Sequence, residues 1–407
     1  MTTQIATESR NAGGWERPKP FPRDVLEFAG IPVVSAGSGG QPYGVWSDRH
    51  GGCFLLPEVC RGNSAAPSAP VIRGFTRAFP QLGRLDRLVW RTGAHDRLFL
   101  EGDAVADLSK AMNNSDNGRS LLGLHIAVPG AYRKLTAVVV SPDFRPLAFG
   151  KLAAHEGGKS RILAESETLR QLEQISGIQG RVPRLIGLEQ WGNQFLLVVT
   201  AGPERRAGRR FSKAHREFLT RIYTGTLKMR SFHESGAARR WRESIEWLTG
   251  EYSEPDLILL RTAVACLEDS LCADDLPVTL AHGDFTSGNT RRGPDGLFVF
   301  DWEAAIHEAL PGHDAFHFGA LPNALRGREL RRPPAAVSWI RDLLPGGARI
   351  LDDLWLGFLV ELGLQYARAR VSRPEDGDDR VLTAVISAIA GEIGGQPPNN
   401  TSFMELA

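Results

Sequence analysis

The chain has 407 residues, of which 42% are hydrophobic, so it can bury full hydrophobic cores and disorder is excluded as its main state. The 48 Lys and Arg residues almost balance the 47 Asp and Glu residues, which excludes the strongly basic field that holds proteins on nucleic acid or anionic lipid. At roughly 100–200 residues per domain, the length predicts two or three structural units.

The sequence predicts neither a secretion signal nor a membrane span. The first twenty residues lack an apolar core behind a basic start, and no apolar run approaches the roughly 18–20 residues of a membrane span. The four cysteines, Cys53, Cys60, Cys266 and Cys272, do not have zinc-binding or CxxC redox spacing, and we expect reduced thiols. We therefore expect a cytoplasmic protein without nucleic-acid or membrane partners; the oligomeric state stays open.

The N-terminal part is predicted to lie outside the main functional core. Residues 1–22 are polar and end in three prolines, which is typical of a flexible lead-in. Residues 23–119 contain short apolar runs between breaks rich in Gly, Ser and Pro, and these predict a small α+β accessory region of unknown role. The polar segment KAMNNSDNGRS is rich in turn formers, so we place a domain boundary near residue 119.

Residues 120–202 are predicted to form a sheet with one helix. Short apolar runs between turn formers predict strands, and the leucine spacing in ESETLRQLEQI predicts a helix between the third and fourth strands. The segment SPDFRP, between the second and third strands, is typical of a hairpin turn. The predicted order is β-β-β-α-β-β, with strands at 121–128, 135–141, 146–153, 184–190 and 194–200.

Residues 203–395 are predicted to be mainly helical, with a tail at 396–407. The segment begins with an arginine-rich loop, which we interpret as a solvated connection between the two parts. Helical spacing of apolar residues then predicts helices that include residues 213–232, 255–271, 350–370 and 380–393.

The segment TLAHGDFTSGNTRRGPDGLFVFDWEAA, residues 279–305, carries most of the chemical information. Asp284 follows a short apolar run, Asn289 comes five residues later, and Asp301 follows the run FVF after the turn GPDG. Mg²⁺ prefers one or two protein oxygens beside substrate phosphates, which makes Asn289 and Asp301 candidate Mg²⁺ ligands. Phosphoryl transfer needs a carboxylate that orients the acceptor hydroxyl, and Asp284 suits this catalytic role.

The motifs HGDFTSGN and FDWE resemble those of the aminoglycoside phosphotransferase and choline kinase-like family of small-molecule kinases. The two motifs agree with the family in identity, order and spacing, and the likeness covers about residues 120–390. It implies that Asp284 is the catalytic aspartate and that Asn289 and Asp301 hold Mg²⁺. It also implies that His282 supports the loop and that Asp314, in PGHDAFHF, is a structural aspartate.

The resemblance extends to the nucleotide-binding part. Lys151, in the third strand, corresponds to the lysine that contacts the nucleotide phosphates. Glu165, in the following helix, corresponds to the glutamate that pairs with this lysine, and Glu167 stays open as the alternative. The chain has no GxGxxG, which the family often lacks, so the loop 129–134 with Gly130 is expected to cover the phosphates.

The fold that the resemblance implies is α+β and protein kinase-like. It has two lobes: an N-lobe with a five-stranded antiparallel sheet plus a helix, at residues 120–202, and a mainly helical C-lobe with the catalytic loop, at residues 203–395. The small N-terminal α+β region precedes them.

Three features have a chemical interpretation that we do not prefer. The sequence GKS at 158–160 ends like a phosphate-binding P-loop, but Ala153 stands where that motif needs glycine. His313 and His317 are four residues apart and could bind a transition metal, although helix packing is the simpler interpretation. Acidic residues such as Glu303 and Glu308 could favour a cationic acceptor, but we interpret them as a charged rim.

The resemblance implies an ATP- and Mg²⁺-dependent phosphotransferase acting on a hydroxyl of a small metabolite, such as a sugar, amino sugar or amino alcohol. The sequence names neither the acceptor nor a preference for ATP over GTP. The alternative is a non-catalytic kinase-like nucleotide-binding module with a regulatory or scaffolding role. Because Lys151, Asp284, Asn289 and Asp301 are all present, the enzyme is preferred.

Overall fold

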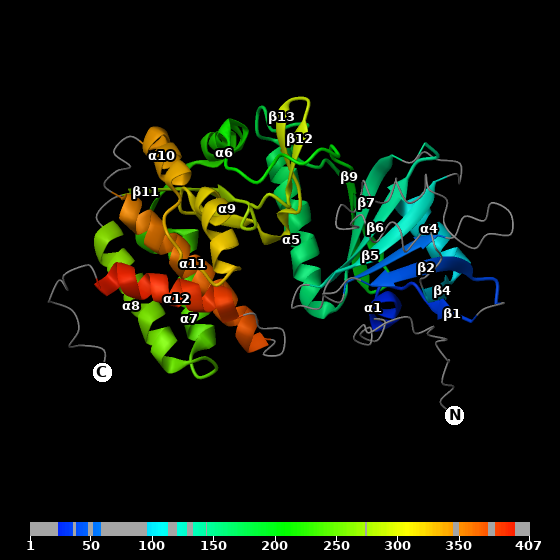
Figure 1. Cartoon of the computed structure of the whole chain (residues 1–407), viewed down its shortest axis with the longest axis horizontal. Coiled ribbons are helices and arrows are strands. Elements are labelled where there is room, and N and C mark those ends of the chain that lie inside the picture. The colour runs from blue at the N-terminus through cyan, green and yellow to red at the C-terminus, as the bar shows by residue number, and fades with distance from the viewer. Residues whose placement is uncertain are drawn as a thin grey trace. The chain divides into compact units, whose positions relative to one another are not determined.

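The computed structural model describes residues 23–35, 38–47, 52–57, 96–112, 120–127, 133–143, 145–272, 275–344, 350–372 and 379–394. They belong to two compact units (Figure 1): Met1–Arg170 with Val182–Glu204, and Gln171–Arg181 with Arg205–Ala407. The predicted lead-in at 1–22, the tail at 396–407 and the phosphate loop with Gly130 lie outside the described residues.

An antiparallel sheet dominates the first unit (Figure 1). In the described residues it has nine strands in the order β1-β4-β2-β3-β5-β6-β7-β9-β8. The strands are β1 (Val33–Val34), β2 (Gln41–Ser47), β3 (Cys53–Pro57), β4 (Asp96–Leu100), β5 (Leu121–Ile126), β6 (Lys134–Val140), β7 (Pro146–Ala153), β8 (Leu185–Trp191) and β9 (Gln194–Thr200).

All five strands predicted for residues 120–202 form, but the sheet does not end with them. The N-terminal region continues it, because β3 pairs with β5 through the partners Cys53–Ile126 and Leu55–Leu124. The expected five-stranded sheet is therefore one part of a larger sheet. A short apolar run such as CFLLP predicts a buried strand but does not say which neighbour that strand pairs with, so the sequence did not reveal the continuation.

The two faces of the sheet pack against different helices. Leu124 and Leu152 belong to a buried cluster that also contains Leu26 of α1 (Arg23–Phe28) and Leu108 of α4 (Gly102–Met112). Because side chains alternate along a strand, Lys151 lies on the opposite face from Leu152. Helix α5 (Glu156–Glu173) contacts this second face.

The second unit is mainly helical, as predicted. Its helices are α6 (Lys213–Thr226), α7 (Gly236–Leu248), α8 (Glu254–Leu271), α9 (His313–Ala324), α10 (Pro334–Leu343), α11 (Leu351–Ser372) and α12 (Asp379–Gly394). The strands β10 (Lys228–Ser231), β11 (Asp275–Ala281) and β14 (Ile306–Ala309) form one small sheet, and β12 (Thr290–Gly293) and β13 (Gly296–Val299) form a hairpin.

One predicted helix is shorter than expected. The helix predicted over 213–232 ends at Thr226, and the chain continues as strand β10. Strand β10 pairs with β11, for example through Met229 and Pro277. A partner fifty residues away in the sequence thus decides the local structure, and helical spacing alone could not show this.

Helices α9 and α11 form the core of the second unit. Phe316 of α9 packs on Trp355 and Phe358 of α11, with ring centroids 5.2 and 5.7 Å away. This packing buries the first turn of α9, including Asp314. Among the helices in the described part of the chain, none has the length and apolar composition of a membrane span.

Candidate functional site

In the first unit, Lys151 of β7 forms a buried ion pair with Glu165 of α5. The Lys151 Nζ donates to Glu165 Oε1 at 2.6 Å and to Oε2 at 2.7 Å, and the two side chains are 8% and 1% exposed. Glu167, the open alternative, lies on the exposed side of α5. Glu165 is therefore the partner of Lys151, because it shares the buried face of the helix with Ile162 and Leu169.

The resemblance implies that Lys151 contacts nucleotide phosphates, and on that basis we expect Lys151→Met to weaken nucleotide binding about tenfold or more, since the variant cannot make a charge-assisted contact to phosphate. The same change removes the ion partner of the buried Glu165, which should cost about 3 kcal/mol of stability. The double variant Lys151→Met/Glu165→Gln should recover stability but not nucleotide affinity. Calorimetric titration with MgADP and urea unfolding of both variants measure the two effects separately. Unchanged affinity in both variants would contradict the role of Lys151.

The GKS sequence at 158–160 lies in the first turns of α5. Lys159 Nζ donates to Glu156 Oε1 at 2.7 Å and lies 5.8 Å from the centroid of the Phe28 ring. Lys159 is thus held in a local ion pair on the helix surface.

In the second unit, the loop 282–289 connects β11 to β12 and is anchored by Asp314. The Asp314 carboxylate accepts hydrogen bonds from the backbone N–H groups of His282 at 2.7 Å and Gly283 at 3.1 Å. Gly283 has a φ of 78°, and a Cβ at this position would lie 2.0 Å from the carbonyl oxygen of Ala304. Only glycine fits at this position, so a steric constraint explains the glycine of the HGD sequence.

The side chain of His282 links the loop to the strand end before Asp301. Its Nδ1 accepts a hydrogen bond from the Asp284 N–H at 3.2 Å, which requires Nε2 to carry a proton. Nε2 lies 2.9 Å from the Phe300 carbonyl oxygen and donates to it. The ring also packs on Trp302, with centroids 4.6 Å apart. His282 therefore has the loop-supporting position that the resemblance implies.

Asp284 and Asn289 are held together within the loop. Asn289 Nδ2 donates to the Asp284 Oδ2 at 2.9 Å and to the Asp284 carbonyl oxygen at 3.0 Å. Burial raises the pKa of Asp284, and the nearby carboxylates of Asp301 and Glu303 raise it further, while His282 and the Asn289 hydrogen bond lower it. Because Nδ2 faces Asp284, Oδ1 is the Asn289 atom suited to a cation.

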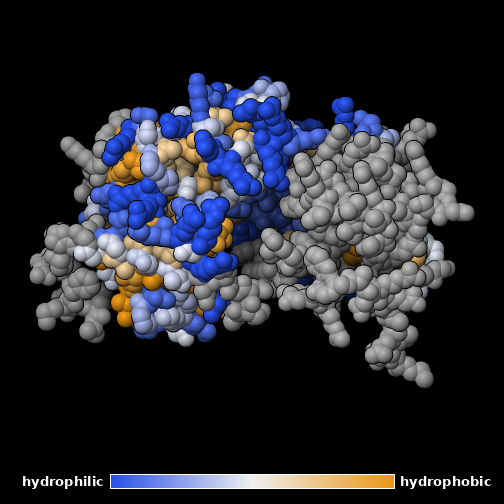
Figure 2. All heavy atoms as spheres, in the orientation of Figure 1, coloured by the Kyte–Doolittle hydropathy of each residue, from blue (hydrophilic) through white to orange (hydrophobic). Residues whose placement is uncertain are grey.

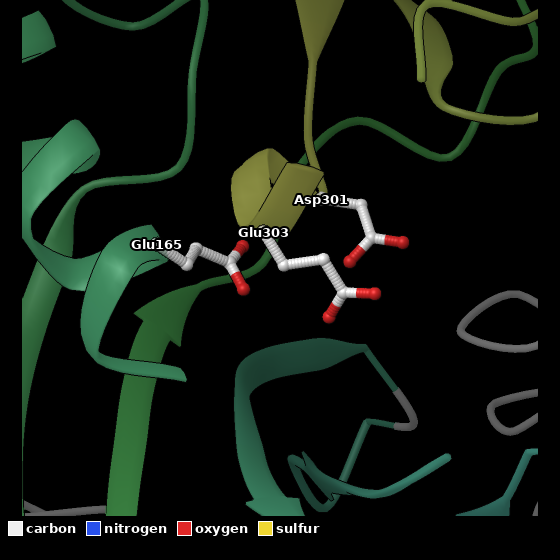
Figure 3. A group of neighbouring side chains, drawn as sticks. All are labelled: Glu165, Asp301 and Glu303. Atoms are coloured by element: carbon white, nitrogen blue, oxygen red, sulfur yellow. The ribbon is translucent and has the colours of Figure 1, made fainter. Parts of the chain in front are cut away.

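Asp301 and Glu303 lie on either side of Trp302 at the short turn η2 (Trp302–Ala304). Their carboxylate oxygens are within 4.8 Å of each other, and Figure 3 shows both side chains extending to the same side of the turn. The third side chain drawn, Glu165, belongs to the first unit. Two carboxylates and an amide oxygen are the donors that Mg²⁺ prefers. The sequence predicts Asn289 and Asp301 as metal ligands, and the structure adds Glu303 as a third candidate. The two acidic residues of FDWE, two positions apart, are the sequence signal for this addition.

Glu308 has a structural role instead of forming an open acidic rim. Its carboxylate accepts hydrogen bonds from the Gly236 N–H at 3.0 Å, at the start of α7, and from Arg230 Nε at 3.2 Å. Lys228 Nζ lies 3.7 Å away. Burial raises the pKa of Glu308, but these hydrogen bonds and cations outweigh burial and lower it overall. Glu308 is thus neutralised locally and gives no support for a cationic acceptor.

His313 and His317 are buried residues of α9, in agreement with the interpretation that they take part in helix packing. Their ring centroids are 6.2 Å apart, and His317 Nδ1 lies 3.4 Å from the Phe285 carbonyl oxygen. In the described ranges, no third ligand completes a metal-binding group with them.

Buried titratable groups in the second unit predict instability in mild acid. Burial lowers the pKa of His215 and His317 to about 4 and of His313 to about 3, and raises the pKa of Asp314 to about 6. As the pH falls below 6.5, the histidines bind protons in the unfolded chain but not in the folded one. Asp314 acts in the opposite direction, because its carboxylate binds a proton at a higher pH in the folded chain than in the unfolded one. From these groups we expect a net uptake of about two protons on unfolding near pH 5, so stability falls by about 3 kcal/mol per pH unit.

Urea unfolding between about pH 4.5 and 7 measures this slope. The variant His317→Gln should lower the uptake by about one proton. An unfolding free energy that does not change with pH would contradict the burial of these groups.

No protein-family model matches the chain, and the comparison with curated proteins finds no match. Among solved structures, the chain is similar to a thermostable mutant of the aminoglycoside phosphotransferase APH(4)-Ia in complex with AMP-PNP and hygromycin B. The alignment has a TM-score of 0.50 and 12% sequence identity, and it covers 72% of this chain and 100% of that chain. Choline kinase from Cryptosporidium parvum Iowa II aligns at a TM-score of 0.48 and 9% identity, covering 71% and 94% of the two chains. Spectinomycin phosphotransferase APH(9)-Ia, in complex with ADP and spectinomycin, aligns at a TM-score of 0.46 and 14% identity, covering 72% and 98%.

At this level of identity the likeness concerns the fold. The α+β architecture, with its large antiparallel sheet and helical second unit, agrees with the expected fold class. The chain therefore has the kinase-like fold of the aminoglycoside phosphotransferases, the family that its two motifs resemble.

Proposed function

We propose that the chain is an ATP-dependent phosphotransferase that moves the γ-phosphoryl group of ATP to a hydroxyl of a small metabolite, such as a sugar, an amino sugar or an amino alcohol. The main support is the arrangement around Asp284. Its carboxylate is held by the Asn289 amide, and its loop is anchored through two backbone N–H groups on Asp314. A preorganised carboxylate of this kind is what positions a nucleophile for phosphoryl transfer.

In the proposed reaction, Asp284 orients the acceptor hydroxyl. The hydroxyl oxygen bonds to the γ-phosphorus, the bond from that phosphorus to the β,γ-bridging oxygen breaks, and ADP leaves. The hydroxyl proton passes to the Asp284 carboxylate. The transition state is largely dissociative, so positioning and charge neutralisation supply most of the rate.

We assign the donor to Lys151 and to oxygen ligands of a Mg²⁺ ion. Lys151, with Glu165 as its ion partner, would contact the α- and β-phosphates. The oxygen donors of Asn289, Asp301 and Glu303 fit Mg²⁺, given that the two carboxylates lie within 4.8 Å of each other. When bound, Mg²⁺ neutralises charge on the phosphate oxygens.

We expect Asp301→Asn to weaken Mg²⁺-dependent nucleotide binding about tenfold or more, because a neutral amide is a poorer ligand for a hard cation. Asparagine is the suitable replacement because Asp301 has a φ of 72°, and Asn tolerates this left-handed conformation better than Ala does. Calorimetric titration with ADP, with and without Mg²⁺, measures the effect. An equal dependence on Mg²⁺ in variant and wild type would contradict the metal assignment.

The function is tested by screening a panel of hydroxylated metabolites for acceptor-dependent release of ADP from ATP. We expect turnover with at least one sugar, amino sugar or amino alcohol, and none with that acceptor in Asp284→Asn. A non-catalytic nucleotide-binding module would bind MgATP but release no ADP with any acceptor. A protein that binds no nucleotide would exclude both interpretations.

A further inference from the structure

Two arginine-bearing segments meet on the second unit. One is the segment before α6, which contains Arg205 and Arg206, and the other is strand β12, which contains Arg291 and Arg292. Arg206 and Arg291 form an isolated antiparallel β-bridge, and the Arg292 N–H donates to the Arg205 carbonyl oxygen at 2.6 Å. Figure 2 shows hydrophilic side chains gathered at the end of the second unit where the β12–β13 hairpin lies.

The Arg291 side chain is held in a defined position. Its guanidinium carbon lies 4.7 Å from the centroid of the Phe300 ring. One terminal nitrogen donates to the carbonyl oxygens of Gly288 at 2.8 Å and Thr290 at 2.9 Å. These contacts use one edge of the guanidinium, whose planar fork has five N–H donors in all.

The two arginines are close enough for their charges to interact. Burial, and then the nearby Arg206, lower the pKa of Arg291 to about 10. Within the described parts of the chain, neither guanidinium forms an ion pair with a carboxylate. The only acidic residue in the hairpin sequence TRRGPDGLFV is Asp295, in the turn. Like charges held this close favour the binding of an anion.

The arginine pair lies close to the proposed metal ligands. The Phe300 N–H donates to the Asn289 carbonyl oxygen at 3.2 Å, so the pairing of the hairpin continues to the level of Asn289. Asn289 directly precedes β12, and Arg291 follows Asn289 by two residues, a separation of at most about 7 Å along the chain. The ring beneath Arg291, Phe300, directly precedes Asp301 in the chain. An anion bound here would therefore be within reach of the phosphotransfer loop.

We propose that Arg206 and Arg291 bind a phosphate group of a ligand that occupies the phosphotransfer site. A guanidinium fork matches phosphate geometry with two parallel hydrogen bonds. The group belongs either to the donor nucleotide or to an acceptor that already carries a phosphate ester. The inference rests on the proposed function for its link to catalysis, and it deepens that function by naming a charged group in the ligand.

The test is calorimetric titration of the whole chain with inorganic pyrophosphate in the absence of Mg²⁺. We expect Arg206→Leu and Arg291→Leu each to weaken pyrophosphate binding about tenfold, because each removes a charge-assisted pair of hydrogen bonds. Leucine keeps apolar contact with Phe300. Arg291→Lys should recover only part of the affinity, because it restores the charge but not the fork. Arg328→Leu, at an exposed arginine in the loop after α9, is the control and should bind as the wild type does.

Repeating the titration with inorganic phosphate on protein saturated with MgADP distinguishes the two sources. If the arginine pair binds a phosphate group of the donor nucleotide, inorganic phosphate will not bind to the MgADP-saturated protein, and Arg291→Leu will also weaken MgADP binding. If the pair holds an acceptor phosphate, phosphate still binds to the MgADP-loaded protein, and Arg291→Leu leaves MgADP affinity unchanged.

Equal pyrophosphate binding in the wild type, Arg206→Leu and Arg291→Leu would overturn the inference, as would a wild type that binds no pyrophosphate. Thermal unfolding of each variant shows whether a loss of binding comes from a loss of fold. A different result would contradict the proposed function: a wild type that binds no MgADP or that has no turnover with any acceptor.

Discussion

Asp284→Asn is expected to lower kcat by about 10² to 10⁴, which is the range for loss of a positioned acid–base group. The affinity for MgADP should stay close to that of the wild type. The amide keeps nearly the same shape and can still accept the hydrogen bond from Asn289, but it cannot take up the proton of the acceptor hydroxyl. Lys151 and Asp301, which we assign to the donor, are unchanged.

Acceptor-dependent ADP release gives kcat, and calorimetric titration gives the affinity for MgADP. Asp342→Asn, at an exposed carboxylate on α10, is the matched control and should retain full activity. Near-normal turnover of Asp284→Asn on an acceptor that the wild type phosphorylates would remove the catalytic assignment. Burial raises the pKa of Asp284. As the pH is lowered, Asp284 should therefore be protonated, and the wild-type activity lost, at a higher pH than expected for an ordinary aspartate.

Asp314→Ala should lower both stability and activity. The variant leaves the backbone N–H groups of His282 and Gly283 without the acceptor that they have at 2.7 and 3.1 Å. Each buried unsatisfied donor costs about 1–3 kcal/mol, so we expect a loss of about 2–6 kcal/mol. A loop that is no longer anchored misplaces Asp284, and kcat should fall by at least about 10².

Urea unfolding and steady-state kinetics measure the two effects. Asp314→Asn provides a graded comparison, since its single amide oxygen can satisfy one of the two N–H groups. We expect intermediate stability for this variant. Unchanged kcat in folded Asp314→Ala would show that the anchor does not position Asp284.

The local pattern of the sequence was sufficient for most helices and strands. The five strands between residues 120 and 202 and the helices α8, α11 and α12 arise where their spacing predicts them. Helix α5 forms over most of the predicted segment ESETLRQLEQI but begins earlier, at Glu156. Pairing between distant segments was not predictable in the same way. Strand β10 replaced the end of a predicted helix because β11 pairs with it, and β3 extended the sheet because its hydrogen-bonding edge meets β5.

The sequence by itself determined the parts of the candidate site that lie within one short segment. Asp284 and Asn289 are five residues apart, so a single loop brings them together. Gly283 is favoured by its φ of 78°, which is a property of the loop backbone itself. Such contacts depend on local backbone geometry, which residue type and spacing express directly.

Only the tertiary structure decided the contacts that join distant segments. It selected Glu165 over Glu167, because one face of α5 is buried against Lys151. It made Glu308 a partner of Arg230 and of the start of α7, although the sequence suggested a charged rim. It also placed Arg206 beside Arg291, eighty-five residues later in the chain. A residue type states what a side chain can bind, but folding decides which groups come within reach, because burial and pairing depend on every packed element together.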